Sequence, residues 1–569
     1  MNTAITSKVA TTPDSEDDGP PTVPPPTSGA TSVIDFKEEV FGMAKIALPA
    51  SMGLLTQYTI SLISTLFCGH LGPTELAGVA LANAMINVTG VSVGVGLASA
   101  CDTLISQTFG SGNVKRVGFI LQRAILILAL GVFISWTFLI NTESILLALR
   151  QDPQIVTVSQ EYVKIVMLAV PAMFAYKVET RYLENQEIMW PVVISGLVAS
   201  SVSALSNYIF LFVLHLGVSG SAGANVIAQY SNSIFLYCYT VCKGLHKDTW
   251  SGWSKECFQE WGVYIRLAIP LMVMMSIEWW TFETIAILAG WINETELGTQ
   301  SIIYELSTVA YMLPFGFSIA GSVKVGNALG AGQTERAKRC AVISIICAAS
   351  VGVCIATIYG TSRNVMAYIF TDDETLRKSV AQVMIIYAPL HIMDAAQAAA
   401  GSILRGMGKQ KMGALISALG YYGLAFPIGL SLMFAAKLGV LGFWIGMSVC
   451  VVVQGLLFMT YLIKVDWKKA TEEALERAGV QGNHTLAEPL MELQDVPGSA
   501  KEEAEGTNDN GNAGTHVLFD AANTVAVTTV GTPLTNRQLV LRRGLAVGVT
   551  LSIFLLGVIA RVLYPRAGM

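Results

Sequence analysis

Long apolar runs alternate with short polar segments along most of this chain, and the pattern predicts a bundle of membrane-spanning helices. A helix needs about 20 mainly apolar residues to cross the hydrocarbon core of a bilayer. The runs before residue 465 predict twelve spans, at 43–67, 77–100, 117–140, 158–178, 190–214, 218–242, 262–290, 298–322, 338–360, 379–403, 411–435 and 439–463. A thirteenth span is predicted near 545–563. The fold class is therefore expected to be an all-α polytopic membrane protein.

The polar segments outside these spans predict two disordered regions. The first forty residues are rich in Pro, Ser, Thr and Asp, and the segment after residue 465 is rich in Glu, Asp, Asn and Gly. Such compositions bury too little apolar surface to offset the entropy of ordering. We expect residues 1–40 to form a disordered cytosolic tail and residues 466–540 a disordered cytosolic linker.

The two halves of the chain repeat each other at an offset of about 220 residues. GHLGPTEL (69–76) is matched by GWINETEL (290–297), and FGSGNVKR (109–116) is matched by LGAGQTER (329–336). Each half has an even number of spans, so both enter the membrane from the same side. Transporters use such parallel halves, which rock around a central cavity. The predicted units are an N-lobe of six spans at 41–245, a C-lobe of six spans at 246–465, and the thirteenth span with an extracellular C-terminus at 541–569.

Charge sets the expected orientation and excludes one class of partner. Only 13% of residues are charged, against about 25% in soluble domains, and no strongly basic segment suggests a nucleic acid. Lys and Arg concentrate in the loops after spans 2, 6, 8, 10 and 12, on the side of the N-terminus. By the positive-inside rule that side is cytosolic, and thirteen spans place the C-terminus outside.

The sequence contains no pattern for an enzyme, a metal site or an ATP-driven pump. None of the nine cysteines forms a CxxC pair, and most lie in apolar runs, as expected of small buried hydrophobic residues. Neither an HExxH motif nor the GxxxxGK[ST] phosphate loop occurs. We therefore expect no catalytic residues, no metal and no cofactor.

Four carboxylic acids inside apolar runs of the second half are the main functional signal. They are Glu278, Glu283, Glu305 and Asp394. A carboxylate in a membrane helix costs roughly 2.5–3.5 kcal/mol on insertion scales, and such residues usually handle protons, ions or charged ligands. The first half has Asp102 and Glu179 near span ends. Glu278 and Glu283 are about 140° apart on a helix, so they should face different surroundings. The alternative is that these acids are buried, protonated and only structural.

Aromatic and polar neighbours of these acids suggest a site for an organic cation. Trp279 follows Glu278 directly, and an indole face beside a carboxylate attracts cations by roughly 0.5–2 kcal/mol. Tyr304 and Tyr311 are expected on the same wall, unless they only pack against lipid or other helices. Asn87, within span 2, is a candidate for hydrogen bonds to the substrate.

His391 and Asp394 are three residues apart and so share a helix face. We expect them to form a hydrogen-bonded pair that tunes protonation, and His391 is also a candidate for contact with the substrate. A metal pair is the alternative, but no further ligand has a matching spacing.

The motifs NVTGVSVGVGLASACDTLISQTFGSG (87–112), IEWWTFE (277–283) and SVKVGNALGAG (322–332) resemble the multidrug and toxic compound extrusion (MATE) family. They are most similar to its vertebrate organic cation/proton exchangers, as are the thirteenth span and the preceding NRQLVLRRGL. The resemblance covers about 43–465 and 536–563. It implies a monomeric antiporter that exports small organic cations in exchange for protons across the apical plasma membrane of epithelial cells.

The resemblance also implies roles for individual residues. The family's important acids fall on the four acids named above, and its reactive substrate-site cysteine on Cys68. Its substrate-contacting aromatics and amide correspond to Trp279, Tyr304, Tyr311 and Asn87. Many prokaryotic relatives carry an acid in the first span, whereas this chain has none between Val40 and Glu75. Position 394 is Asp where some vertebrate relatives have Glu.

Other functions remain as alternatives. The first is a flippase for lipid-linked oligosaccharides, since related folds carry such cargo, although cavities for phosphates tend to be cationic. An intramembrane enzyme would need a catalytic pair or metal cluster that the sequence lacks. A ligand-gated channel would show currents far above the turnover of an antiporter.

Overall fold

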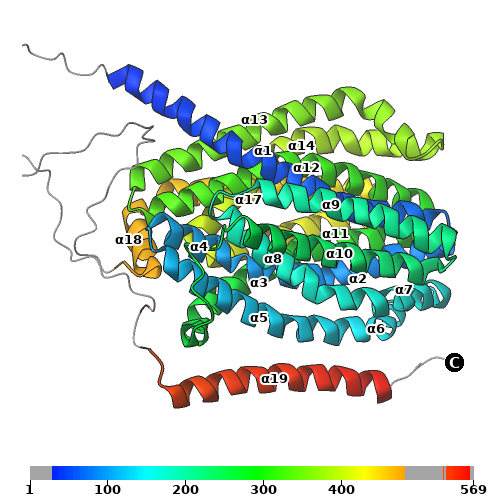
Figure 1. Cartoon of the computed structure of the whole chain (residues 1–569). Helices are drawn as coiled ribbons and strands as arrows, with labels where there is room; N and C mark the ends of the chain where they lie inside the picture. Colours follow the sequence, from blue (N-terminus) through cyan, green and yellow to red (C-terminus); the bar gives the residue numbers. More distant parts are fainter. Residues whose placement is uncertain (1–27, 481–529, 531–532, 564–569) are drawn as a thin grey trace, which may run out of the picture.

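The computed structural model describes residues 28–480, 530 and 533–563, and these residues form helices joined by turns, without a strand among them (Figure 1). The predicted all-α fold is confirmed. Ten helices form the first half: α1 (Ser28–Gly69), α2 (Pro73–Ile86), α3 (Ser92–Ala98), α4 (Ala100–Gly110), α5 (Val114–Ile140), α6 (Thr142–Ala148), α7 (Pro153–Val166), α8 (Val170–Glu184), α9 (Trp190–Tyr208) and α10 (Gly217–Cys242). The second half contains α11 (Trp261–Ile292), α12 (Glu294–Gly330), α13 (Thr334–Met366), α14 (Glu374–Met407), α15 (Gln410–Ala418), α16 (Phe426–Leu430) and α17 (Gly439–Lys464).

Several spans are built from consecutive helices. A π-helical segment, Asn87–Val91, joins α2 to α3 within span 2, and Ile209–Val213 extends α9. Two further π-helical segments, Leu419–Ala425 and Ser431–Ala435, flank α16. Short 3-10 segments occur at Met167–Ala169, Lys255–Phe258 and Ala367–Ile369. Two helices follow α17, namely α18 (Trp467–Ala478) and α19 (Asn536–Leu563).

Twelve described helical segments are long and apolar enough to cross a membrane, and they include α19 and every predicted span except 218–242. That span is nonetheless the continuous helix α10. Its low hydropathy comes from a buried polar face, on which Ser221, Asn225, Gln229 and Asn232 point into the N-lobe. Buried polar groups need hydrogen-bond partners, and α10 finds some within the lobe: Ser221 contacts Ser64, and Asn225 donates to Tyr162.

In each half, one end of the first span packs into the core of the opposite lobe. Met43 and Ala47 of α1 belong to the core of the C-lobe, together with Phe317 of α12. Trp261 and Tyr264 of α11 belong to the core of the N-lobe, where the Tyr264 hydroxyl donates to the Leu97 carbonyl over 2.8 Å. The lobes (α1–α10 and α11–α17) are therefore clasped at the end of the bundle where α18 lies, called here the α18 end (Figure 1).

Two predicted disordered regions contain helices, so these predictions are wrong in part. Residues 28–40 belong to α1, because the last proline of the tail is Pro26 and uninterrupted helix-compatible residues follow. Residues 467–478 form α18, and α19 begins at Asn536. The rest of the predicted tail, and the predicted linker from 481 to 529, lie outside the described residues.

Local sequence explains α18. The Asp466 carboxylate caps the helix by accepting from the backbone amides of Lys468 and Lys469, at 3.0 and 3.1 Å. Gly479 ends it with φ 79°, a left-handed conformation that favours glycine. Ala470, Ala474 and Ala478, spaced by four residues, form its buried face. The polar composition of this segment predicted disorder, whereas its capping residues and the regular spacing of its alanines are the signals of a helix.

Candidate functional site in the C-lobe

The four acids lie on three helices of the C-lobe: Glu278 and Glu283 on α11, Glu305 on α12, and Asp394 on α14. All four side chains are half-buried. None of them forms a salt bridge with any residue that the structure describes. This arrangement leaves four carboxyl groups within membrane spans without a close cationic partner.

Glu278 and Asp394 lie close to each other. Each lies within electrostatic range of the other, and Glu278 also lies within range of the Arg405 guanidinium. Tyr311 is near both acids, and its ring stacks on Phe315 with centroids 5.1 Å apart. Two carboxyls and an aromatic ring thus come together from α11, α12 and α14.

Glu283 has different surroundings, as its angular separation from Glu278 predicted. Its carboxyl lies near the side chain of Asn87, which opens the π-helical segment of the N-lobe, and within electrostatic range of Tyr304. Next to this contact, the indole nitrogen of Trp280 lies 3.3 Å from the Val88 carbonyl oxygen. Asn87 therefore approaches Glu283 across the lobe boundary, and Trp280 of α11 crosses the same boundary in the opposite direction.

Tyr304 and Glu305 occupy adjacent positions on α12. The Tyr304 ring packs against Phe282, with centroids 5.8 Å apart. Glu305 Oε2 is buried and has no hydrogen-bond partner among the described residues. An unpartnered carboxylate oxygen is expensive in an apolar setting. Trp279 is half-buried beside Glu278.

His391 is fully buried, and its Nδ1 lies 3.2 Å from the Tyr387 hydroxyl, one turn earlier on α14. The expected hydrogen bond to Asp394 is not formed: Nε2 of His391 has no partner among the described residues. The reason is geometric, since His391 is directed towards Tyr387 while Asp394 lies towards Glu278. His391 does not line an open surface here. Within the described residues, no group of three or more potential ligands could hold a metal ion.

Cys68 is also buried, and its thiol donates to the Ser221 hydroxyl over 3.0 Å. Its contacts are in the core of the N-lobe, beside α10. In this conformation the structure does not bring Cys68 together with the C-lobe acids.

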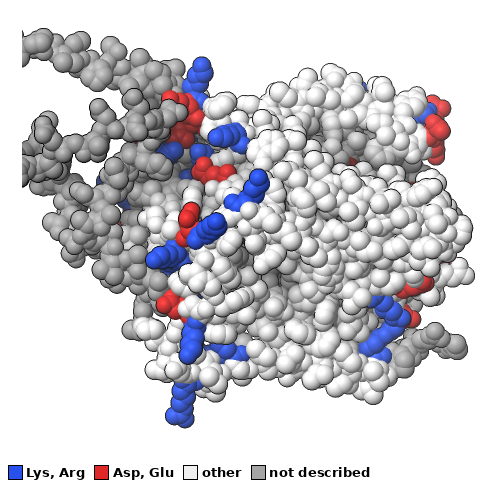
Figure 2. Space-filling view, viewed as in Figure 1, with Lys and Arg blue, Asp and Glu red and all other residues white. Residues whose placement is uncertain are grey.

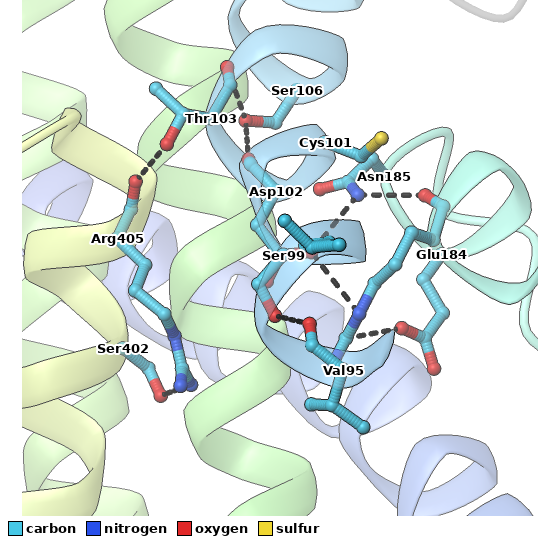
Figure 3. A network of polar contacts seen from close by, with 12 residues as sticks. Val95, Ser99, Cys101, Asp102, Thr103, Ser106, Glu184, Asn185, Ser402 and Arg405 are labelled. Atoms are coloured by element: carbon cyan, nitrogen blue, oxygen red, sulfur yellow. Dashed lines mark hydrogen bonds and ion pairs between the residues drawn. The ribbon is translucent and has the colours of Figure 1, made fainter. Parts of the chain in front are cut away.

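The sequence reasoning missed a charged network at the boundary between the lobes (Figure 3). Arg181 lies between Asp102 (3.4 Å) and Glu184 (2.8 Å), and the Asn185 amide donates to Asp102 over 3.4 Å. The N-lobe acids Asp102 and Glu184 are thus paired, unlike the four C-lobe acids. The cluster of charges in KVETRYLENQE (177–187) was the signal available in the sequence.

Arg405 of α14 is the second residue that was missed. Its side chain is buried and donates to the Ser402 hydroxyl, while its Nε has no partner among the described residues. Its backbone carbonyl accepts from the Thr103 hydroxyl of the N-lobe over 2.5 Å (Figure 3). Arg405 therefore links the lobe boundary to the surroundings of Glu278.

Comparisons with known proteins agree with this architecture. The MatE family model matches the chain twice, at residues 49–209 and 270–430, in agreement with the internal repeat. The chain is 52% identical to multidrug and toxin extrusion protein 1 of Danio rerio over 94% of this chain and 92% of that protein. It is 44% identical to the protein of the same name from Homo sapiens, over 92% of this chain and 94% of that one.

A solved structure supports the same fold. The crystal structure of the eukaryotic MATE transporter AtDTX14 superimposes with a TM-score of 0.75 at 26% identity, and the match covers 78% of this chain and 99% of that one. The chain therefore belongs to the MATE family and is a membrane transporter that extrudes compounds.

Proposed function

We propose that this transporter exports organic cations in exchange for protons, with Glu278, Glu283, Glu305 and Asp394 as the groups that bind either a proton or the cation. The observation that carries the proposal is the absence of a salt bridge to any of these acids within the described residues. An unpaired carboxyl in a membrane span is stable when it is protonated or when a bound cation neutralises it. Those two states are what a proton/cation exchanger alternates between.

Aromatic rings around the acids support an organic rather than an inorganic cation. Trp279, Tyr304 and Tyr311 lie on the same two helices as Glu278 and Glu305. Ring faces attract alkylammonium groups, while inorganic ions prefer several oxygen ligands. Asn87 supplies a neutral amide next to Glu283. The relatives' printed names, which speak of multidrug and toxin extrusion, agree with a site that accepts varied cations.

Competition at Glu278 would couple the two fluxes. A proton arriving from an acidic exterior displaces the cation outward, and a cation arriving from the cytosol displaces the proton inward. One pH unit corresponds to about 1.4 kcal/mol, which supports roughly tenfold accumulation when one proton exchanges for one monovalent cation. Under this proposal the two positive charges never occupy Glu278 together.

Charge distribution supports an orientation with the α18 end in the cytosol. Figure 2 shows Lys and Arg gathered mainly at that end of the molecule, as the positive-inside rule requires of a cytosolic face. The N-terminus is then cytosolic and the C-terminus extracellular. We place the protein, as a monomer, in the plasma membrane, at the apical surface of epithelial cells.

The test is uptake of labelled tetraethylammonium into cells expressing the chain, after acid loading of the cytosol and with external pH stepped upward. The antiporter, run in reverse, should show uptake that rises with external pH. Glu278→Gln should abolish this uptake at unchanged surface expression. The matched control is Glu374→Gln, because Glu374 is exposed and forms a surface salt bridge with Lys378 over 2.7 Å.

Normal pH-dependent exchange in the Glu278→Gln variant would overturn the assignment of that residue. No cation flux from well-expressed protein would overturn the cargo, and a lipid-flipping assay would then test the lipid-linked oligosaccharide alternative.

A further inference from the structure

The short helix α18 lies across the boundary between the lobes at the α18 end (Figure 1). It packs against α4 of the N-lobe and against α12 and α13 of the C-lobe. It lies beyond both segments that the family model matches. A single helix of twelve residues thus contacts both of the bodies that must separate if this end opens.

Arg477 joins the two lobes directly. Its Nε donates to the side-chain oxygen of Gln107 on α4 over 3.0 Å, and its Nη2 donates to the Met407 carbonyl at the end of α14 over 3.0 Å. The guanidinium is planar, always charged and able to donate in two directions at once. One side chain therefore holds one group from each lobe.

Three further contacts distribute α18 over both lobes. On the N-lobe side, the Asn113 amide donates to the Ala478 carbonyl over 3.1 Å. On the C-lobe side, Lys409 forms a salt bridge with Glu473 at 2.7 Å, and the hydroxyls of Thr334 and Thr471 lie 2.7 Å apart. Movement of the lobes apart must break one of these sets, because α18 is too short to follow both.

The contacts beneath α18 show that this end is closed in the structure. The Gln107 amide donates to the Gly406 carbonyl over 2.8 Å, and Thr103 donates to Arg405 as described above. Gln107 therefore bonds the C-lobe directly through its nitrogen and α18 through its oxygen. Because Gln107 makes both bonds, separation of the lobes at this point also disturbs the contact with α18.

We propose that α18 is a clasp that favours closure of the lobes at the α18 end, and that Arg477 is its positioning residue, setting how often the transport site opens to that side. The inference rests on the alternating opening that the proposed transport function requires. It adds an element outside the twelve-span core to the machinery that sets the conformational equilibrium.

The experiment measures opening without substrate. Spin labels at Lys115→Cys and Glu335→Cys, both exposed at the α18 end on opposite lobes, report the distance between lobes in purified full-length protein. The exposed Cys238, Cys242 and Cys354 are first replaced by serine. Arg477→Ala should raise the population with long distances about tenfold, as expected for the loss of charge-assisted bonds. Arg477→Lys, which keeps the charge but loses the two-way fork, should lie between.

Glu472→Ala is the matched control, since Glu472 is exposed on the same helix. Transport provides a second readout, because apparent affinity scales with the population of the competent state. Arg477→Ala should lower the half-saturating cation concentration on the α18 side and raise it on the other side. A residue with only a structural role would not move the two values in opposite directions.

An unchanged distance distribution in Arg477→Ala would overturn the clasp, whether or not transport is observed. A changed distance distribution in a protein that transports no cation would support the clasp and contradict the proposed cargo. If Arg477→Ala does not reach the membrane, hydrogen exchange of α18 in unmutated protein decides. Protection of its amides should fall when cation on the α18 side drives opening, and unchanged protection during a measured opening would refute the proposal.

Discussion

Gly110 and Asn327 approach so closely that a methyl group on Gly110 would lie 2.0 Å from the Asn327 carbonyl oxygen. The same contact occurs a second time with the roles of the lobes reversed, because a methyl group on Gly330 would lie 1.9 Å from the Gln107 carbonyl oxygen. Gly110 and Gly330 occupy equivalent places in the internal repeat, as do Gln107 and Asn327. The closed α18 end is therefore built on one contact used twice about the pseudo-symmetry axis.

This geometry predicts that Gly110→Ala opens the α18 end. No flexible side chain can move to relieve the overlap, since the obstacle is backbone, and overpacking typically costs 1–3 kcal/mol. The penalty falls only on the closed state, so the distance between labels at positions 115 and 335 should lengthen. Gly330→Ala should have the same effect. Gly262→Ala is the control, because nothing lies within 4 Å of a methyl group there, and a shift of equal size in that variant would contradict this explanation.

Paired and unpaired acids should respond oppositely to loss of charge. Arg181→Met leaves Asp102 and Glu184 buried without their cation, and breaking such a pair typically costs 3–5 kcal/mol. We expect a clearly lower melting temperature in detergent. Glu278→Gln removes a carboxyl that has no salt-bridge partner among the described residues, so its melting temperature should be equal to or above that of the unmutated protein. Equal destabilisation by both variants would contradict the division of acids into structural and transport groups.

Most of the fold follows from hydropathy and from the internal repeat, because most membrane spans are apolar over about 20 residues and the repeat supports the weaker span at α10. That acids within these spans turn away from lipid could be expected from the cost of a carboxylate in hydrocarbon, but the approach of Glu278, Asp394 and Tyr311 to one another could not, because the three residues come from three different helices. Arg405 was missed because its link to the N-lobe, the bond from the Thr103 hydroxyl to the Arg405 carbonyl, joins residues that only folding brings together. The hydrogen bond between His391 and Asp394 was wrongly predicted because a spacing of three residues gives a shared face, but not which way each side chain turns.

Glu283→Gln should separate hydrogen bonding from charge at the lobe boundary. A glutamine has the same shape and can still accept a hydrogen bond from the nearby Asn87 amide, so folding and surface expression should be unchanged. Loss of the negative charge should raise the half-saturating concentration of a cationic substrate by about tenfold, the effect of about 1.4 kcal/mol. Cation-binding titrations on purified protein would measure it. Asn87→Ala provides the complementary variant, because it keeps the charge but removes the donor, and a larger affinity loss there than in Glu283→Gln would contradict a charge-based role.

Ending the chain after Val480 should preserve exchange per molecule at the surface, whereas ending it after Val465 should not. The first truncation removes α19, which packs along α5 on the outside of the bundle and is fastened at its ends by Arg543 to the Phe258 carbonyl and by Arg561 to Glu143. These anchors lie away from the C-lobe acids, so α19 should affect assembly or trafficking more than turnover.

The second truncation also removes α18 with Arg477, and the lobes should then open more readily at the α18 end. Counting surface copies by biotinylation, beside the initial rate of cation exchange, separates the two effects. Equal rates per copy from both truncations would show that α18 has no part in transport, and a lost rate in the longer one would assign that part to α19.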